Sequence, residues 1–574
     1  MPTSARFLLN VLLIFSAQAL LPSAALAVVD AGAIQQNLEK QLPPARTLPE
    51  PGKPKPSNVP TPKEADVTFI VNAFALEGVS VLPESQVQAV LKPYLGIQLT
   101  FSELEKACDA ITNLYRQSGY SVQVVVLPQS MSKTGGTVKL RVTEAKLSSV
   151  VINVLNGDNR FGAGLVEKYI ADANPIGQPL NLNSIERSLI ILNETPGVIV
   201  TSQLDAGKEQ GDTDLKISLG ETPLKQGRIE TNNSGSRSTG TFQAISALSF
   251  NNVTGIGDQV ALNGIASEGS RYIQGTYSFP ISTDGLRLSL YGTQLRYENV
   301  GSYAFPNGAY GNALTHGLNF SYALVRTKAA NLNATFGYDV KRYLNQLMST
   351  NTTNSAYKIN NVVTGLSGNA YDNFGGNAVT NGSASITLGR LDISPTSITG
   401  YGAHTPARFK KLSLSGSRNQ SMDEVGKSSL FLSLSGQFAS ANLNSGEQFY
   451  LGGPYGVRAY PVSQGGGAQG ALLVAEFRQQ LPDNLTASVF FDAGIVQQYK
   501  RPFNEWQGKT NANNSYSLMG SGFGMKWSDG KWNVTGSIAW RVRNNPLYSQ
   551  TGEAVNNDGL VSQPRGWMNV SYSF

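Results

Sequence analysis

The residues best suited to binding chemistry are one arginine and two carboxylates in the C-terminal part of the chain. Arg458 lies in the turn-rich segment Leu451–Pro461, inside a loop of about 25 residues, and loops of that length are usually functional or disordered. Asp492 belongs to the segment Phe490–Gly494, and Glu476 lies on the strand expected between them. A carboxylate that faces an inserted arginine can hold it through a bidentate, charge-assisted pair. The residues therefore indicate an ionic clasp, with an exposed Arg458 and a water-bound Asp492 as the alternative.

Strand alternation decides which side chains could share a lumen with this pair. Successive side chains of a strand point to opposite faces. If Val489, Phe491 and Ile495 point outward, the side chains that point inward are those of Phe490, Asp492, Gly494, Glu476 and Arg478.

The chain offers little material for catalysis. It has one cysteine, Cys108, and two histidines, His316 and His404, which we expect in loops or at strand edges. One cysteine excludes an intrachain disulfide and a cysteine-based metal cluster, and the histidines give little support to a Ser-His-Asp triad. The glycines at 520–524 lack the strand-turn-helix context of a nucleotide loop. We therefore expect no enzyme activity, cofactor or metal, and scattered basic residues favour no nucleic-acid partner.

From about residue 225 to the C-terminus the chain is a series of amphipathic strand patterns. In Trp532–Arg543 and Leu430–Ala439, apolar residues alternate with polar or small ones, and turn residues separate such segments. The polar face carries charges, while the apolar face repeatedly ends in aromatic residues. This pattern is typical of a membrane barrel of about sixteen strands, with lipid outside and a wet lumen inside. A soluble all-β protein would also alternate and is the alternative.

Two mixed modules precede the strand series, at 67–145 and 146–222. Each pattern predicts a strand, two helices and two further strands. In the first module, Ser102–Glu105 predicts a capping box, in which serine and glutamate satisfy free N–H groups at a helix start. Cys108 falls on the inward face of that helix and is expected to be a small core residue.

The N-terminal segment combines an export signal with a tethered helix. Arg6, an apolar run and Ala25-Leu26-Ala27 predict a secretory signal peptide over residues 1–27, cleaved after Ala27, with an uncleaved anchor as the alternative. Residues 28–44 predict a short, mostly polar helix. The proline-rich segment 45–66 can continue neither helix nor sheet and predicts an extended linker.

These features together resemble the two-partner-secretion outer-membrane transporters, of the haemolysin-activator and filamentous-haemagglutinin-transporter type. The two modules resemble paired POTRA domains, and residues 28–66 resemble the plug helix and linker of that family. The segment 252–258 resembles its early hairpin, and Phe574 resembles the signal read by the barrel-assembly machinery. The family's Val-Arg-Gly-Tyr lid-loop motif is matched by Val457, Arg458, Ala459 and Tyr460, and its Phe-x-Asp-x-Gly strand motif by Phe490, Asp492 and Gly494.

One departure from the family pattern concerns the backbone of the loop. Ala459 stands where the motif has glycine, so a conformation that needs positive φ is in doubt there. The pair of Arg458 and Asp492 is what the resemblance implies for the site, with Glu476 and Arg478 as further lumen partners.

The resemblance implies a mainly β fold with an outer-membrane location. This expected fold comprises a 16-stranded antiparallel transmembrane barrel at 223–574, with a lid loop at about 440–467. Two periplasmic α+β POTRA domains and the plug helix precede the barrel. The implied function is export of one partner exoprotein, expected to be large and β-helical. Outer-membrane lipid and the barrel-assembly machinery are further implied partners, and we expect a monomer. An outer-membrane protein insertase of the same superfamily is the alternative, and whether the exoprotein is a cytolysin, an adhesin or a growth inhibitor stays open.

Overall fold

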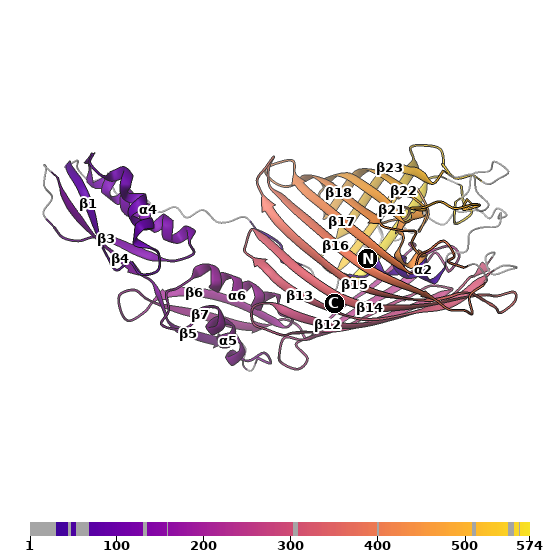
Figure 1. Ribbon diagram of the computed structural model, residues 1–574, viewed down its shortest axis with the longest axis horizontal. Helices are drawn as coiled ribbons and strands as arrows, with labels where there is room; N and C mark the ends of the chain where they lie inside the picture. Colours follow the sequence, from indigo (N-terminus) through magenta and orange to yellow (C-terminus); the bar gives the residue numbers. More distant parts are fainter. Residues whose placement is uncertain are drawn as a thin grey trace.

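A computed structural model describes residues 30–43, 48–52, 68–129, 135–155, 157, 159–301, 308–398, 401–507, 513–548, 556–561 and 563–574. The predicted signal peptide at 1–27 lies outside these residues. The described chain forms a large barrel with two small mixed modules at one end, which we call the module end (Figure 1). Among these residues, no helix has both the length and the apolar character needed to cross a membrane.

The barrel confirms the predicted fold class. Within the described residues, sixteen antiparallel strands form a closed ring, and the last strand pairs with the first. Closure satisfies the backbone groups of every strand without leaving an open edge, as a lipid environment requires. The strands are β8 (Lys225–Asn232), β9 (Gln243–Asn251), β10 (Gln259–Ala266), β11 (Ser270–Pro280), β12 (Leu286–Glu298), β13 (Ala309–Arg326), β14 (Ala330–Leu347), β15 (Thr353–Asp372), β16 (Ala378–Ile393), β17 (Arg408–Ser421), β18 (Ser428–Ala439), β21 (Gln469–Gln480), β22 (Leu485–Gln497), β23 (Ser515–Ser528), β24 (Trp532–Arg541) and β25 (Arg565–Ser573).

Several barrel strands are longer than the sequence pattern predicted. The alternation that a lipid-facing band produces marks segments of about ten residues, whereas β15 has 20 residues. Beyond that band a strand has no lipid contact, so apolar residues no longer mark its outer face. His316 was expected in a loop or at a strand edge, but it lies within the extended strand β13 and pairs with Gly292 and Val340.

The two modules have the predicted order of elements. The first contains β1 (Phe69–Glu77), α3 (Glu84–Leu91), the 3-10 turn η1 (Lys92–Tyr94), β2 (Gln98–Leu99), α4 (Phe101–Gln117), β3 (Val122–Val126) and β4 (Gly136–Glu144). The second contains β5 (Lys146–Val154), α5 (Ala163–Ala173), α6 (Leu182–Glu194), β6 (Val198–Ala206) and β7 (Asp212–Glu221). Their sheets have the strand orders β2-β1-β4-β3 and β5-β7-β6, and each has its own apolar core.

Helix α4 begins earlier than predicted. The capping box is formed by Thr100 and Glu103, not by Ser102 and Glu105. Thr100 Oγ1 accepts from the Glu103 N–H at 3.2 Å, and the Glu103 carboxylate accepts from the Thr100 N–H at 2.7 Å. Two overlapping S/T-x-x-E patterns occur here, and the preceding strand β2 fixes which one is used. Burial raises the pKa of the Cys108 thiol to about 11, which makes it poorly reactive at neutral pH.

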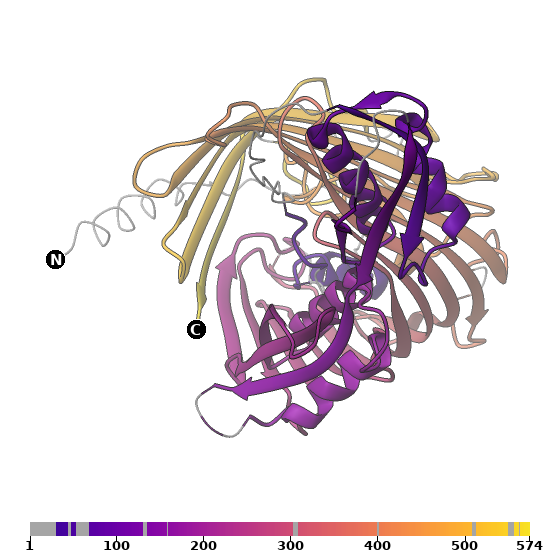
Figure 2. The same ribbon diagram turned by 90° about the vertical axis from the view of Figure 1, so that its left-hand side faces the viewer.

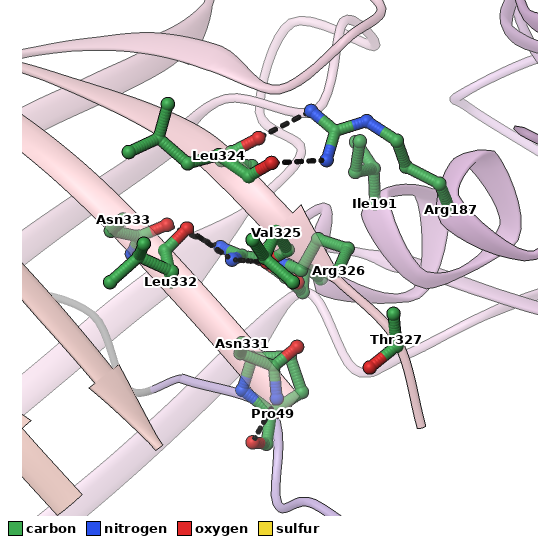
Figure 3. Close-up of polar contacts among 12 residues, drawn as sticks. Pro49, Arg187, Ile191, Leu324, Val325, Arg326, Thr327, Asn331, Leu332 and Asn333 are labelled. Atoms are coloured by element: carbon green, nitrogen blue, oxygen red, sulfur yellow. Dashed lines mark hydrogen bonds and ion pairs between the residues drawn. The ribbon is translucent and has the colours of Figure 1, made fainter. Parts of the chain in front are cut away.

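The second module is fastened to the barrel at the turn between β13 and β14 (Figure 3). Arg187 of α6 donates to the main-chain oxygens of Ala323 and Leu324. Glu194, the last residue of α6, pairs with Arg326, whose side chain is fully buried. Removing one partner of a buried ion pair leaves an uncompensated charge, so this joint holds the module in a defined position.

The described part of the linker follows the barrel wall beside that joint. The Pro49 oxygen accepts from Asn331 at 3.1 Å and from Asn369 at 2.9 Å, and the Gly52 N–H donates to Lys328 O at 2.7 Å. The contact between Pro49 and Asn331 is visible in Figure 3. The chain therefore leaves the lumen along β14 and β15.

Helix α2 (Ala31–Glu39) lies inside the barrel. Asp30 caps its N-terminus by accepting from the Ala33 N–H at 3.1 Å, and Gln35 donates to Thr315 on the wall at 3.1 Å. Ile34 and Leu38 are buried in one apolar cluster with wall residues that include Tyr272, Tyr297, Tyr343 and Tyr357. A polar helix with one narrow apolar stripe suits this position, because the lumen wall itself mixes polar groups with tyrosine rings.

Deleting residues 28–41 should enlarge the ion conductance of the protein in planar lipid bilayers, because α2 fills part of the lumen. A smaller version of the effect should come from Gly32→Ala, since a Cβ at Gly32 would lie 2.6 Å from the main-chain nitrogen of Gly446. Gly52→Ala is the matched control, because a Cβ there meets nothing within 4 Å. Unchanged conductance after the deletion would remove the plug assignment.

Candidate functional site

The lid loop comprises residues 440–468, between β18 and β21. It contains the 3-10 turn η3 (Ser445–Glu447) and the short strands β19 (Phe449–Tyr450) and β20 (Gly466–Gly467), which pair with each other. Its tip folds into the lumen against β21–β25. Leu451, Val457 and Tyr460 from the loop are fully buried in a cluster with wall residues Leu472, Phe490, Val496, Leu518 and Ala539.

Arg458 and Asp492 form the expected clasp in the interior of the barrel. The Arg458 Nε donates to Asp492 Oδ2 at 2.9 Å, and one terminal nitrogen donates to Oδ1 at 2.8 Å. The Arg458 backbone N–H also donates to Oδ2, at 3.0 Å. The Asp492 side chain is 0% exposed and that of Arg458 13% exposed. Three donors from one residue thus satisfy one carboxylate that has no access to water.

The clasp extends to the other two lumen residues proposed from the sequence. The second terminal nitrogen of Arg458 donates to Glu476 Oε2 at 2.9 Å, and Arg478 donates to Glu476 Oε1 at 2.9 Å. The Arg458 guanidinium also lies over the Phe490 ring, 3.3 Å from its centroid. Each oxygen of the two carboxylates therefore has a cationic donor, and the arginine side chain is held on its flat face and at both terminal nitrogens.

Small residues on the wall make room for the loop. A Cβ at Gly494 would lie 2.5 Å from a methyl carbon of Leu451, and a Cβ at Gly520 would lie 2.7 Å from the Cβ of Ala459. A side chain at Gly494 would therefore displace Leu451 of the loop. The glycines at 520–524 lie on β23, which supports the interpretation that they are small residues on one strand face.

The alanine at position 459 is compatible with this loop. Ala459 is absent from the described residues with positive φ, a set that includes Ser463 of the same loop. Ala459 is 1% exposed, and its Cβ lies against Gly520 of β23. The doubt raised by the missing glycine is resolved, because the conformation at this position does not need one.

A second ionic anchor at the start of the loop was not found from the sequence. Glu447 of η3 is 2% exposed and pairs with Lys341 on β14, at 2.8 Å, and with Lys411 on β17. Asn361 adds a hydrogen bond to the same carboxylate at 2.9 Å. Lone lysines on separate strands carry no spacing signal, so only closure of the barrel reveals that they converge.

The loop also contacts the plug helix. Ser445 Oγ donates to Asp30 Oδ2 at 2.6 Å, and Gln36 of α2 donates to Ser445 O at 3.1 Å. Gly446 approaches so closely that a Cβ on Gly32 would lie 2.6 Å from its main-chain nitrogen, and a Cβ on Gly446 would lie 3.0 Å from the Tyr343 hydroxyl. The plug and the lid loop therefore share one interface inside the barrel.

This arrangement binds the lid loop to the barrel wall through charged groups that satisfy one another. Within the described ranges, no three His, Cys, Asp or Glu side chains are grouped so that they could hold a metal ion. The charged groups of the site are saturated by one another, so none is positioned as an unengaged acid, base or nucleophile. Such a set of contacts fits a conformational lock.

Comparison with protein families identifies both parts of the chain. Residues 211–527 match the family model described as haemolysin secretion/activation protein ShlB/FhaC/HecB, which is more than half of the chain. Residues 69–145 match the POTRA domain of ShlB type. The second module has the same strand-helix-helix-strand-strand order as the first, without the short elements η1 and β2.

Curated relatives and solved structures agree with this result. The chain is 24% identical over 469 residues to the heme/hemopexin transporter protein HuxB of Haemophilus influenzae, covering 79% of this chain and 80% of the relative. It is 26% identical over 466 residues to the outer membrane transporter CdiB of Dickeya dadantii, covering 77% and 80%. The solved structure of CdiB from Escherichia coli shares the fold with a TM-score of 0.73 at 19% identity, covering 96% of this chain and 100% of that one.

The module end of the barrel is thus the periplasmic end, and the lid loop enters the lumen from the opposite side. Members of this family are transporters rather than enzymes, in keeping with the saturated charges of the clasp. The chain belongs to the haemolysin secretion/activation (ShlB/FhaC/HecB) family and is an outer-membrane transporter of two-partner secretion, with its POTRA domains in the periplasm.

Proposed function

We propose that this transporter exports a single large, β-helical exoprotein and rests in a locked state until that exoprotein arrives. The observation that carries the proposal is the buried clasp of Arg458, Asp492 and Glu476, which closes the lumen with the transporter's own chain. A passive pore has no need of such a lock. A channel that must open for one substrate has to remain closed to other periplasmic solutes.

The order of events follows from where each part lies. We assign recruitment to POTRA domains at 67–145 and 146–222, the lock to the lid loop at 440–468, and passage to the barrel at 223–574. In the sheet of each module, an outer strand offers backbone groups to which an extended segment can be added. In the second module this strand is β6, whose Ile199 and Leu204 side chains are 49% and 43% exposed.

We also assign the source of the driving force for export. We place the folding of the exoprotein outside the cell as the step that makes export irreversible, because a folded β-helix cannot return through the lumen.

Outer-membrane lipid surrounds the apolar outer face of the barrel, where Leu434 and Ile495 are more than half exposed. The assembled transporter is proposed to be a monomer, inserted by the barrel-assembly machinery that reads Phe574.

Removing either partner of the clasp should impair secretion without preventing insertion. Arg458→Ala leaves Asp492 without its cation, and Asp492→Ala leaves Arg458 with one carboxylate fewer. Loss of a partner from a buried pair costs about 3–5 kcal/mol, so we expect each variant to lower the yield of secreted exoprotein at least tenfold. Arg458→Lys should restore only part of the yield, because lysine lacks the planar fork.

A double-mutant cycle makes the clasp test decisive. Because the two residues act as one unit, the double variant should secrete about as much as either single variant. Arg390→Ala is the matched control, since its pair with Asp392 is exposed on the barrel surface, and its yield should stay within twofold of the parent. Heat-modifiable migration on gels reports folding of the barrel in every variant. Strictly additive losses would show that Arg458 and Asp492 do not act together.

Deleting residues 67–143 should abolish secretion and leave the barrel folded, because the first module has an apolar core of its own. The measurement is the amount of exoprotein in the medium, with a candidate exoprotein from a neighbouring gene supplied by co-expression. Heat-modifiable migration of the truncated transporter is the folding control. Continued secretion by the truncated form would contradict the recruitment role of this module.

A further inference from the structure

A second feature of the lumen is a large polar cavity beneath the tip of the lid loop. Its volume is about 530 Å³, and it is bounded by the loop at Pro454, Tyr455 and Arg458 and by the inner wall from β18 to β25. Its lining reaches the periplasmic strand ends at Gln480 and Thr486. The size falls in the range of small-ligand sites, which span roughly 300–1,000 Å³.

Part of the wall of this cavity is lined by small residues, namely Ser429, Ser488, Gly524, Thr535, Gly536 and Ser537. Larger side chains, among them Gln480 and Trp567, line the rest. The glycines leave room for the backbone of an extended peptide, and the neighbouring hydroxyl groups can form hydrogen bonds with that backbone.

The charges that line the cavity are mainly positive. They are the four cations Lys427, Arg458, Arg478 and Lys526 and one carboxylate, Glu476. Both oxygens of Glu476 are already engaged by the two arginines. Among the described residues, neither lysine ammonium forms an ion pair within 4.0 Å, although the Lys427 backbone N–H donates to Asp423 Oδ1 at 2.9 Å. Both lysines line the cavity and are exposed. A cleft lined by one sign of charge concentrates its field and attracts the opposite sign.

The second module does not lie in front of the periplasmic opening of the cavity. That module contacts the turns β9–β10, β11–β12 and β13–β14, through the Arg160 contact to Asn252 O, the Arg187 contact to Asp284 O and the Glu194–Arg326 pair. The cavity borders β17–β18, β21–β22 and β23–β24 on the remaining part of the ring. Figure 2 shows the second module beside, and not in front of, the C-terminal strands drawn in yellow at the left.

We propose that this cavity is a docking site for an extended, acidic segment of the exoprotein, which it holds beneath the lid loop before the clasp opens. The inference rests on the proposed function and adds the chemistry of the segment that reaches the lumen first. An extended strand carrying Asp or Glu side chains would place its backbone along the serine and glycine wall. Its carboxylates would meet Lys427 and Lys526 at the rim and approach Arg458 at the inner end.

The test uses the full-length transporter in detergent and two synthetic probes, so it requires no exoprotein. The probes are 20-residue oligo-glutamate and oligo-lysine peptides, each with one activated cysteine that forms a disulfide with a thiol. In a Cys108→Ala background, Ser488→Cys places the reporter thiol on the cavity wall, and Thr486→Cys is the substitute if the first variant does not fold. Reaction with a neutral methanethiosulfonate measures the accessibility of the thiol in every variant.

We expect oligo-glutamate to cross-link at least tenfold faster than oligo-lysine at low salt. Adding K427E and K526E should slow the oligo-glutamate reaction at least tenfold, while the neutral reagent reacts as before. K531E is the matched control, because Lys531 lies in the β23–β24 turn outside the cavity lining, and the rate should stay within twofold.

Two results would overturn the proposal. One is equal cross-linking of the two peptides, and the other is an oligo-glutamate rate that K427E and K526E leave unchanged. Neither result would affect the transport function, which is measured separately by secretion of the exoprotein. Raising the salt concentration to 1 M shortens the screening length to about 3 Å and should reduce the difference between the peptides.

Discussion

The closed state depends on one cation held away from water. Arg458 reaches the lumen on a loop that joins β18 and β21 at the end of the barrel opposite the modules. Its charge is tolerated in the lumen only because Asp492 and Glu476 satisfy it. The wall around it is shaped for this contact, since Gly494 and Gly520 leave space for Leu451 and Ala459. Without the pair, the buried apolar cluster around Tyr460 would still favour the inward position of the loop. The cluster alone would not determine which loop residue lies opposite Asp492 on β22.

The lid loop has two ionic anchors, and they connect it to opposite parts of the wall. At its start, Glu447 lies between Lys341 on β14 and Lys411 on β17. At its tip, Arg458 binds Asp492 on β22. The plug helix contacts the loop at Ser445, beside the first anchor. A displacement of the loop start would therefore disturb the plug, and the tip residues Gly452–Tyr455 also border the plug at Gln36 and Lys40. Two ionic anchors thus hold one segment at separate places on the wall, with the plug beside both.

Much of this architecture follows from local patterns in the sequence. Alternation with outward Val489 and Phe491 was sufficient to place Asp492 in the lumen, and the capping and apolar patterns predicted the module helices. The missing parts depend on long-range contacts. The convergence of Lys341 and Lys411 on Glu447 requires a closed ring, and the Trp567 indole that donates to Arg458 O at 2.8 Å lies 109 residues away. The capping box was misplaced because two patterns overlap, and strand ends beyond the lipid band lose their apolar face.

The plug and the linker that joins it to the first module occupy one side of the lumen. The linker residues Pro49 and Gly52 bind the wall at β14 and β15, next to the turn that holds the second module. Plug, linker and module therefore occupy the same part of the ring, and the polar cavity occupies the wall from β18 to β25. A substrate delivered from the module would thus have to cross the periplasmic opening to reach the unobstructed wall. The proposed docking site would bring such a segment beneath Arg458, and also beside the plug at Ser234, whose main-chain oxygen accepts from Asn37.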